Sequence, residues 1–272
     1  MRGLLKTPKP KESSGKGLQK VDVVVLTKNS QEQLERSLKA VYKNVPVNRM
    51  IVVDGFSTDR TLEILEKFNR KHHNVLLIQD KGLRGKARQI GIEKVETEWF
   101  MFVDSDAELC DKWFEKAKAF ITPDVGAIWG IEVWSVIKNP RVLRLFLQVT
   151  MNIFKIRGGT HDLLVRRNAV KGIKIPSDLH SFEDAFIKEW ISKKGFTVVA
   201  TYNPYCIHHR PSMVWSFKSG IKIAQSELRC GLLQKYPSLL LSYGFYVAYF
   251  MFQSLRKASL PMLQLVEPQK NT

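Results

Sequence analysis

Apolar residues in the first hundred positions follow two alternating periodicities. Short runs rich in β-branched residues, typical of buried parallel strands, are separated by stretches whose apolar residues recur every three or four positions, as on one face of a helix. The runs predict strands at residues 21–26, 50–53, 75–78 and 99–103. The intervening stretches predict helices after Ser30, over residues 59–68 and in the second half of residues 81–92. Four strands alternating with three helices indicate an α/β fold with an open, mostly parallel sheet.

The first predicted helix has a defined start and a defined inner face. Ser30 and Gln33 have the spacing of a capping box, in which each side chain bonds the backbone N–H of the other residue. The residues expected to face the sheet are Leu34, Leu38 and Val41. Sheets of this kind bind ligands beyond the carboxyl ends of their strands. The polar residues expected at those ends are Thr27, Asn29, Asp54 and Asp104.

The alternation weakens after residue 106. The pattern there predicts a short helix at residues 113–120, one or two strands within residues 125–136, a largely apolar helix at residues 141–154, a helix from Ser181 to Gly195 and a strand at residues 198–200. A further short strand is predicted after Gly158 and Gly159. We therefore expect a flexible basic tail at residues 1–20, one folded domain at residues 21–213 and a C-terminal helical segment at residues 214–272.

The C-terminal segment contains about twenty consecutive residues, 236–255, without a charge. A helix of that length is roughly 30 Å long, which is the thickness of a bilayer core. Lys235, Arg256 and Lys257 flank it, whereas its serines, proline and glycine are also compatible with a helix at a bilayer surface or in a protein core. Together with the apolar helix at residues 141–154, this segment predicts a protein on the cytoplasmic face of a membrane.

The chain carries 43 Lys and Arg against 26 Asp and Glu, which gives a net charge of +17. A surface of that sign favours anionic partners, such as nucleic acid, an anionic membrane or a phosphorylated small molecule. The basic residues are scattered, and no stripe of interleaved basic and aromatic residues supports a nucleic-acid surface. The three cysteines form no C-x-x-C pair and are odd in number, which argues against a disulfide framework and favours a reducing compartment.

The sequence FMFVDSDAEL at residues 100–109 places two aspartates directly after a predicted buried strand. No basic residue stands beside Asp104 or Asp106 in the sequence. Carboxylates two positions apart at the end of a strand can meet one hard cation, such as Mg²⁺ or Mn²⁺. Because aspartate is common in turns, the motif by itself is more typical of a solvated turn.

Several motifs occur in a fixed order along the chain. These are VVVLTKNS, VVDGFSTDRT, GLRGKARQIGI, FVDSDAEL, two glycines before a strand that ends in two arginines, Glu-Asp at the start of a helix, and a His-His pair. The ordered set resembles family 2 glycosyltransferases with the GT-A fold, and the resemblance covers residues 21–210. It implies an enzyme that transfers a hexose-type sugar from a nucleotide-sugar donor with the help of a divalent metal, Mn²⁺ or Mg²⁺.

The resemblance assigns the donor to the ends of the first strands and to the loop at residues 81–88. Asp54 would bind the base, although D-G-F-S is also a good turn sequence. Thr27 and Asn29 would line the same rim, with helix capping as the alternative for Asn29. The glycines of the loop would let the backbone approach a diphosphate, and Arg84 and Arg88 would supply cations near it, with Arg88 preferred because it lies one helical turn inside, on the face toward the strand ends.

The resemblance also assigns the metal site. Asp106 would bind the metal directly, and Asp104, in the same site, would mainly orient the ribose or a bound water. A metal that stabilises a leaving diphosphate needs further oxygen or nitrogen ligands. His208 is preferred over His209 for that position.

An inverting transfer needs a base that removes the proton of the attacking hydroxyl. In SFEDAF, Asp184 resembles the base of the family, and Glu183 would help to orient the acceptor. Acidic residues at a helix start also occur simply because they complement the helix dipole. Gly158 and Gly159 would let the acceptor lie close to the backbone.

The sequence lacks, after His209, the Q-x-x-R-W motif of polymerising family members. This departure indicates a single-addition transferase that acts on a lipid-linked sugar, a polyprenyl phosphate or a protein. Two alternatives stay open. A nucleotidyltransferase of related fold would carry a G-x-G-T-R loop beside the first strand, where this chain has LTKNSQEQ. A non-catalytic basic protein at a membrane surface would share the charge.

Overall fold

The computed structural model describes residues 20–134, 159–179 and 183–209, and the single positions 221, 225 and 228. The chain divides into two compact units, Met1–Pro211 and Ser212–Thr272. Every helix and strand named below belongs to the first unit. Within the described residues, no helix has the length and apolar character needed to cross a membrane. The predicted helix at residues 141–154 and the uncharged segment at residues 236–255 lie outside the described residues.

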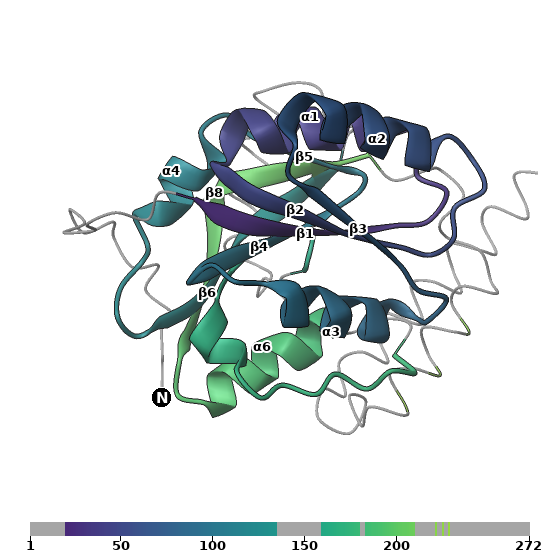
Figure 1. The fold of residues 1–272 in the computed structure, drawn as a ribbon. Coiled ribbons are helices and arrows are strands. Elements are labelled where there is room, and N and C mark those ends of the chain that lie inside the picture. Colours follow the sequence, from purple (N-terminus) through teal and green to yellow (C-terminus); the bar gives the residue numbers. More distant parts are fainter. Residues whose placement is uncertain are drawn as a thin grey trace, which may run out of the picture. The chain divides into compact units, whose positions relative to one another are not determined.

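Eight strands form one sheet in the order β3-β2-β1-β4-β7-β6-β8-β5 (Figure 1). They are β1 Val21–Thr27, β2 Val47–Asp54, β3 Val75–Gln79, β4 Trp99–Asp104, β5 Ala107–Leu109, β6 Val125–Trp134, β7 Asp162–Arg166 and β8 Thr197–His208. β1 to β4 are parallel to one another. β7 is antiparallel to β4 and β6, β8 is parallel to β6, and β5 is antiparallel to β8. The predicted parallel sheet is confirmed for the first four strands, whereas the second half is mixed.

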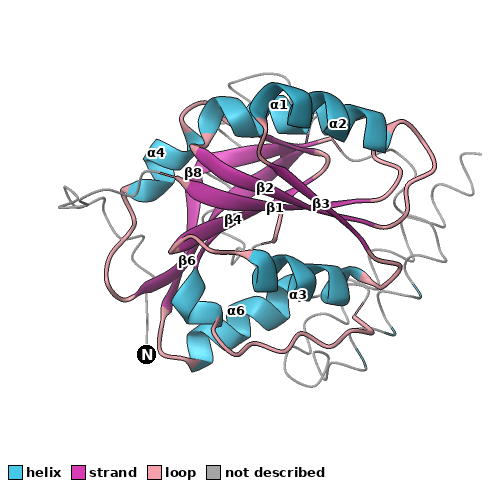
Figure 2. Cartoon of the chain, viewed as in Figure 1, coloured by secondary structure: helices cyan, strands magenta, loops and turns pink. Residues whose placement is uncertain are grey.

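Helices cover both faces of the sheet (Figure 2). They are α1 Leu34–Asn44, α2 Thr61–His72, α3 Arg84–Lys94, α4 Trp113–Lys118, the 3₁₀ helix η1 Arg167–Val170 and α6 Glu183–Lys193. α1 and α2 lie on one face, and α3 and α6 lie on the other. Successive side chains of a strand point to opposite faces. Val23 and Val25 of β1 therefore pack in the same core as residues of α1, and Val24 packs in the core that includes residues of α6.

α1 has the predicted inner face but not the predicted start. The inward residues Leu34, Leu38 and Val41 are all fully buried. The helix begins only after a turn, in which the backbone oxygen of Ser30 accepts hydrogen bonds from the N–H groups of Gln33 and Leu34. Gln33 makes no side-chain capping bond, so the predicted capping box is wrong. The Ser30 hydroxyl instead lies 3.0 Å from the hydroxyl of Ser105, which stands between the two aspartates.

β8 is much longer than the strand predicted at residues 198–200. It extends to His208 because it pairs with β6 along its length and with β5 at its end. The sequence pattern predicts neither β5, which has three residues, nor this last part of β8. The β5–β8 register places Ala107 opposite His208, so the histidine lies next to Asp106.

Candidate active site

The two aspartates of the D-S-D motif lie at the end of β4 and in the turn that follows. Asp104 is the last residue of β4, and one of its carboxylate oxygens accepts a 2.6 Å hydrogen bond from Arg88. A carboxylate oxygen of Asp106 lies 2.7 Å from Nε2 of His208. Burial opposes ionisation of Asp104, but the charges of Arg88 and His208 outweigh it and hold the pKa of Asp104 well below its usual value. Both aspartates thus have basic partners that do not stand beside them in the sequence: Arg88 lies 16 residues before Asp104, and His208 lies 102 residues after Asp106.

Asp104, Asp106 and His208 bring three potential metal ligands to one place. One oxygen from each carboxylate and one ring nitrogen all lie within 4.8 Å of one another. Carboxylate oxygens suit Mg²⁺ and Mn²⁺, and imidazole is a common ligand of transition metals, so the set fits Mn²⁺ better than Mg²⁺. His209 points elsewhere, with Nε2 2.7 Å from a carboxylate oxygen of Glu108. Of the two candidate histidines, only His208 belongs to this group of described residues.

His208 is held between two carboxylates. Burial lowers the pKa of its imidazole, but hydrogen bonds to Asp106 and Glu132 outweigh burial and raise the pKa to about 9. Without a metal, the ring is therefore a cation at neutral pH. A histidine must be neutral to bind a metal, so metal binding at this group would release a proton.

Arg88 connects the aspartates to the start of α6. Its side chain is only 3% exposed, and its guanidinium lies over the ring of Phe102. Nη2 donates 2.6 Å hydrogen bonds to Asp104 and Thr160, and Nε lies 3.9 Å from a carboxylate oxygen of Glu183. Arg84, one helical turn earlier, is exposed at the first residue of α3. Both arginines are predicted near the diphosphate, with Arg88 preferred, but Arg88 is buried against Asp104 and Arg84 is the one in solvent.

Asp54 is fully buried at the end of β2. Its carboxylate accepts hydrogen bonds from the Thr27 hydroxyl at 2.8 Å, from the N–H and hydroxyl of Ser57 at 2.9 and 2.5 Å, and from the Gln79 amide at 3.2 Å. Burial opposes ionisation, but these bonds together lower the pKa of Asp54. A carboxylate can usually accept about four hydrogen bonds, so these four donors occupy its acceptor positions. Asp54 therefore organises the turn after β2, and a nucleotide base would have to replace one of these donors to bind it.

Asn29 lies at the same rim, in solvent, with the left-handed φ of 50°. Its side-chain oxygen accepts a 2.9 Å hydrogen bond from the N–H of Thr58, so it binds the turn after β2 and does not cap α1. Phe56 in that turn is also left-handed, with φ 57°, and its ring is exposed. The ammonium of Lys81 lies 5.1 Å from the centre of that ring.

Glu183 and Asp184 form the first turn of α6. Glu183 is buried and Asp184 is partly exposed. Burial and then the neighbouring charge of Glu183 raise the pKa of Asp184 to about 7, although Asp184 accepts a 2.8 Å hydrogen bond from the N–H of Ala185. A carboxyl group with that pKa can exchange a proton near neutral pH.

Gly158 lies outside the described residues, and Gly159 leads into β7. A Cβ at Gly159 would collide with the imidazole of His161. The glycine is therefore needed for the local packing of His161, in addition to the predicted approach of an acceptor.

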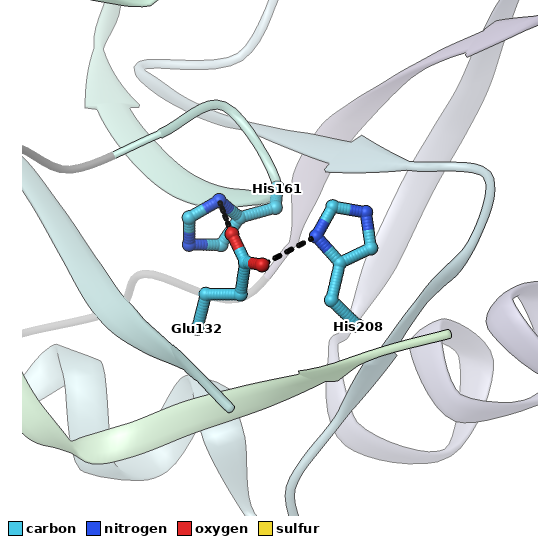
Figure 3. A group of neighbouring side chains, drawn as sticks. All are labelled: Glu132, His161 and His208. Atoms are coloured by element: carbon cyan, nitrogen blue, oxygen red, sulfur yellow. Dashed lines mark ion pairs between the residues drawn. The ribbon is translucent and has the colours of Figure 1, made fainter. Parts of the chain in front are cut away.

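Two residues of the site, Glu132 and His161, are absent from the sequence predictions. Glu132 comes from β6 and His161 from the residue before β7, and the Glu132 carboxylate lies between the rings of His161 and His208 (Figure 3). One signal was available: Glu132 is the single charged residue in the strand VGAIWGIEVW. Its proximity to His208 depends on the pairing of β6 with β8, which the local pattern does not contain.

A mixed sheet with aspartates at the ends of its parallel strands, and helices on both faces, has the architecture of a GT-A glycosyltransferase. The sequence matches the profile of Glycosyl transferase family 2 over residues 22–162, just over half of the chain. The chain belongs to this family. The prediction from the order of motifs is thereby confirmed.

Curated relatives match a shorter region. The poly(ribitol-phosphate) beta-N-acetylglucosaminyltransferase TarS of Staphylococcus aureus is 34% identical over 109 residues, which cover 38% of this chain and 19% of TarS. The poly(ribitol-phosphate) beta-glucosyltransferase of Bacillus spizizenii is 30% identical over 109 residues, which cover 36% of this chain and 17% of the relative. The matched region is thus less than a fifth of the length of each relative.

Solved structures extend the similarity to most of the chain. TarS residues 1–349 in complex with UDP-GlcNAc aligns with a TM-score of 0.55 and 23% identity over 71% of this chain and 59% of that chain. The mannosyltransferase PcManGT from Pyrobaculum calidifontis, in complex with GDP-Man and Mn²⁺, aligns with a TM-score of 0.57 and 16% identity over 88% of this chain and 80% of that one. At these identities the structural similarity supports the fold.

Proposed function

We propose that the chain is a metal-dependent glycosyltransferase that uses a nucleotide-sugar donor. The observation that carries the proposal is the convergence of three potential metal ligands at the carboxyl end of a parallel strand: Asp104 and Asp106 from one segment, and His208 from a distant one. Arg88 joins this group to the acidic start of α6, since it contacts both Asp104 and Glu183. The proposed leaving-group site is thereby linked to the turn that carries the candidate base Asp184, on which the charges of Arg88 and Asp104 also act.

For the donor, we propose a UDP-linked hexose or N-acetylhexosamine. TarS, which was solved with UDP-GlcNAc, supports the choice of nucleotide. Thr27, Asn29 and Asp54 would form the rim for the nucleoside. The exposed Arg84 is the better candidate for direct contact with the diphosphate, while the buried Arg88 would act by holding Asp104.

Asp106 and His208, with Asp104 beside them, would hold the divalent cation, for which we propose Mn²⁺. The donor set fits, and the structure of PcManGT, which contains Mn²⁺, supports this choice. When bound, the cation supplies positive charge for the negative charge that develops on the departing diphosphate.

For the transfer we propose Asp184 as the base. Its carboxylate would accept the proton of the acceptor hydroxyl while the hydroxyl oxygen bonds to the anomeric carbon of the sugar. The bond from that carbon to the diphosphate breaks, and its electron pair leaves with the diphosphate oxygen. Attack from the face opposite the diphosphate inverts the configuration, and Glu183 with Gly159 would help to place the acceptor.

For the acceptor we propose a phosphate-bearing molecule at the cytoplasmic face of a membrane. The names of the curated relatives indicate poly(ribitol-phosphate) acceptors, and the net charge of +17 favours an anionic substrate. The uncharged residues 236–255 favour a lipid-linked acceptor or a polyprenyl phosphate. A screen that offers each of these acceptors with UDP-GlcNAc, UDP-glucose and GDP-mannose would separate them.

The test of the proposed function is release of UDP from UDP-GlcNAc by the full chain, with the acceptors of this screen present to receive the sugar. We expect release that requires Mn²⁺, is lost in EDTA and returns when Mn²⁺ is restored. Asp106→Ala should lower it by roughly 100-fold or more and Asp104→Ala almost as much, because the charge of the leaving diphosphate is then less compensated. Asp111→Ala is the matched control, since Asp111 is exposed and pairs with Lys43 at the surface.

Two results would contradict the proposal. Full activity of Asp106→Ala in EDTA would exclude the metal site. Failure of the wild-type chain to bind any nucleotide sugar in ultrafiltration with Mn²⁺ would favour a non-catalytic protein of the same fold.

A further inference from the structure

We propose that Glu132 is a positioning residue that sets which nitrogen of His208 faces the metal. The inference rests on the proposed metal-dependent function. Glu132 is not one of the proposed ligands; it would act through His208, by holding Nδ1 so that the lone pair of Nε2 is directed to Asp106 and the cation.

The sheet explains why Glu132 reaches His208. In the β6–β8 register, Glu132 lies opposite Cys206, and His208 is two residues further along β8. Residues two apart on a strand point to the same face, so Glu132 and His208 are diagonal neighbours on one face of the sheet. Their proximity is therefore fixed by backbone pairing and does not depend on a flexible loop.

The contacts of Glu132 are directional. One carboxylate oxygen lies 3.3 Å from Nδ1 of His208, and the other lies 3.8 Å from Nδ1 of His161, so each oxygen faces a different ring (Figure 3). Nε2 of His208, at the opposite side of its ring, lies 2.7 Å from Asp106. The side chains of the two histidines and of Glu132 are 9%, 6% and 18% exposed, so little water can replace these contacts.

The position of the proton on the imidazole ring decides which of its two nitrogens can bind a metal. A neutral histidine carries its proton on one nitrogen and offers the lone pair of the other. A carboxylate only accepts hydrogen bonds, and in the structure Nδ1 faces Glu132 while Nε2 faces Asp106. Once the Asp106 carboxylate binds the cation, Glu132 still accepts at Nδ1, so a metal-bound His208 would carry its proton on Nδ1. In that form Nε2 has a free lone pair on the side of Asp106, which is the nitrogen that the proposed metal site requires.

A second explanation is that Glu132 only compensates the positive charge of the buried His208, whose pKa is raised, while burial lowers the pKa of His161. That role would affect folding stability but would not favour one ring nitrogen of His208 over the other for a metal. The two explanations therefore differ in metal affinity and in the position of the His208 proton.

The first test is the affinity of the full chain for Mn²⁺ in the presence of saturating UDP, measured by calorimetry. For Glu132→Gln we expect affinity about 10- to 100-fold weaker, because an amide can donate to Nδ1 and so favours the proton on Nε2. Glu108→Gln is the matched control: Glu108 forms the neighbouring carboxylate–histidine pair with His209, at 2.7 Å, outside the Asp104–Asp106–His208 group. We expect unchanged Mn²⁺ affinity for this control. Equal affinity of Glu132→Gln and wild type would overturn the inference.

The second test needs no mutant, so it holds even where Glu132→Gln fails to fold. In ¹⁵N-histidine NMR spectra of the wild-type chain with Mg²⁺ and UDP, His208 should carry its proton on Nδ1. A proton on Nε2 in that complex would overturn the inference directly. If the wild-type chain instead binds neither Mn²⁺ nor Mg²⁺ with UDP, the proposed metal-dependent function itself fails, which is a different result from a Glu132 variant that binds as well as wild type.

Discussion

Asp184 has the least typical acid–base properties among the proposed catalytic residues. Burial and the adjacent Glu183 raise the pKa of its carboxyl to about 7, whereas the pKa of Asp104, beside Arg88, is lowered. The neighbours of these two aspartates thus shift their pKa values in opposite directions. Asp104 stays an anion at any physiological pH, as a residue near a metal must, and Asp184 can take up and release a proton.

The raised pKa of Asp184 predicts the pH dependence of the transferase. A base must be ionised, and Asp184 is protonated below its pKa, so kcat/KM should rise with pH up to about 7 and level off above it. Asp184→Asn should lower turnover by roughly 100-fold, remove this rise and leave UDP affinity unchanged. Mn²⁺ must be saturating at every pH, because His208 has to lose a proton to bind it. Loss of UDP affinity in Asp184→Asn would make Asp184 a donor-binding residue instead.

Phe56 offers a test of backbone strain at the proposed nucleoside rim. Its φ of 57° is unfavourable for a residue with a Cβ, and its ring is 44% exposed, so little burial offsets the cost. Phe56→Gly and Phe56→Ala both remove the ring and its contact with Lys81, but only glycine adopts this φ freely. We expect the free energy of unfolding, measured by urea denaturation, to be up to about 1 kcal/mol higher for the glycine variant than for the alanine variant. A more stable alanine variant would show that this turn is not strained.

The strands and helices up to residue 104 are predictable because each has its own periodicity. β1 to β4 and α1 to α3 lie where the pattern places them, with Asp104 at the end of its strand. The predicted capping box is wrong because the chain forms a turn in which the backbone oxygen of Ser30 accepts hydrogen bonds from Gln33 and Leu34. The end of β8 is not predictable from its own pattern, because only pairing with β6 and β5 makes it a strand. The same reason applies to the site. The resemblance to the family already places Asp106 and His208 in one metal site, but Glu132 and His161 enter the site only through the pairing of strands in the sheet.

The packing of α3 on β1 predicts an effect of enlarging Gly91. A Cβ at this position would collide with the side chain of Val24. Alanine is the better helix former, but overpacking costs about 1–3 kcal/mol, so Gly91→Ala should destabilise the fold by roughly 1 kcal/mol. Lys94→Ala, at an exposed position of the same helix, is the control and should have little effect. In a double-mutant cycle with Val24→Ala, the cost of Gly91→Ala should fall, and an unchanged cost would show that this contact does not limit the packing.

The whole chain combines a folded family 2 region with features that this region does not explain. The profile match ends at residue 162, and the first compact unit ends at Pro211. The net charge of +17 and the uncharged residues 236–255 both fit a location at an anionic membrane. Such a location would also bring the enzyme to a lipid-linked or polymeric phosphate acceptor, so the proposed substrate and the proposed location support each other.

The membrane proposal predicts how the full chain fractionates. We expect it to sediment with membranes, and to bind vesicles that contain anionic lipid more strongly than neutral vesicles, with the difference reduced at high salt. Replacing Phe245 and Val247 by Asp in the uncharged segment should move the chain toward the soluble fraction, because charged side chains are costly within a bilayer. Resistance of the wild-type chain to alkaline extraction would indicate a span, and release would indicate a surface helix. A wild-type chain that stays monodisperse in the soluble fraction without detergent would contradict the membrane location and remove the main support for a lipid-linked acceptor.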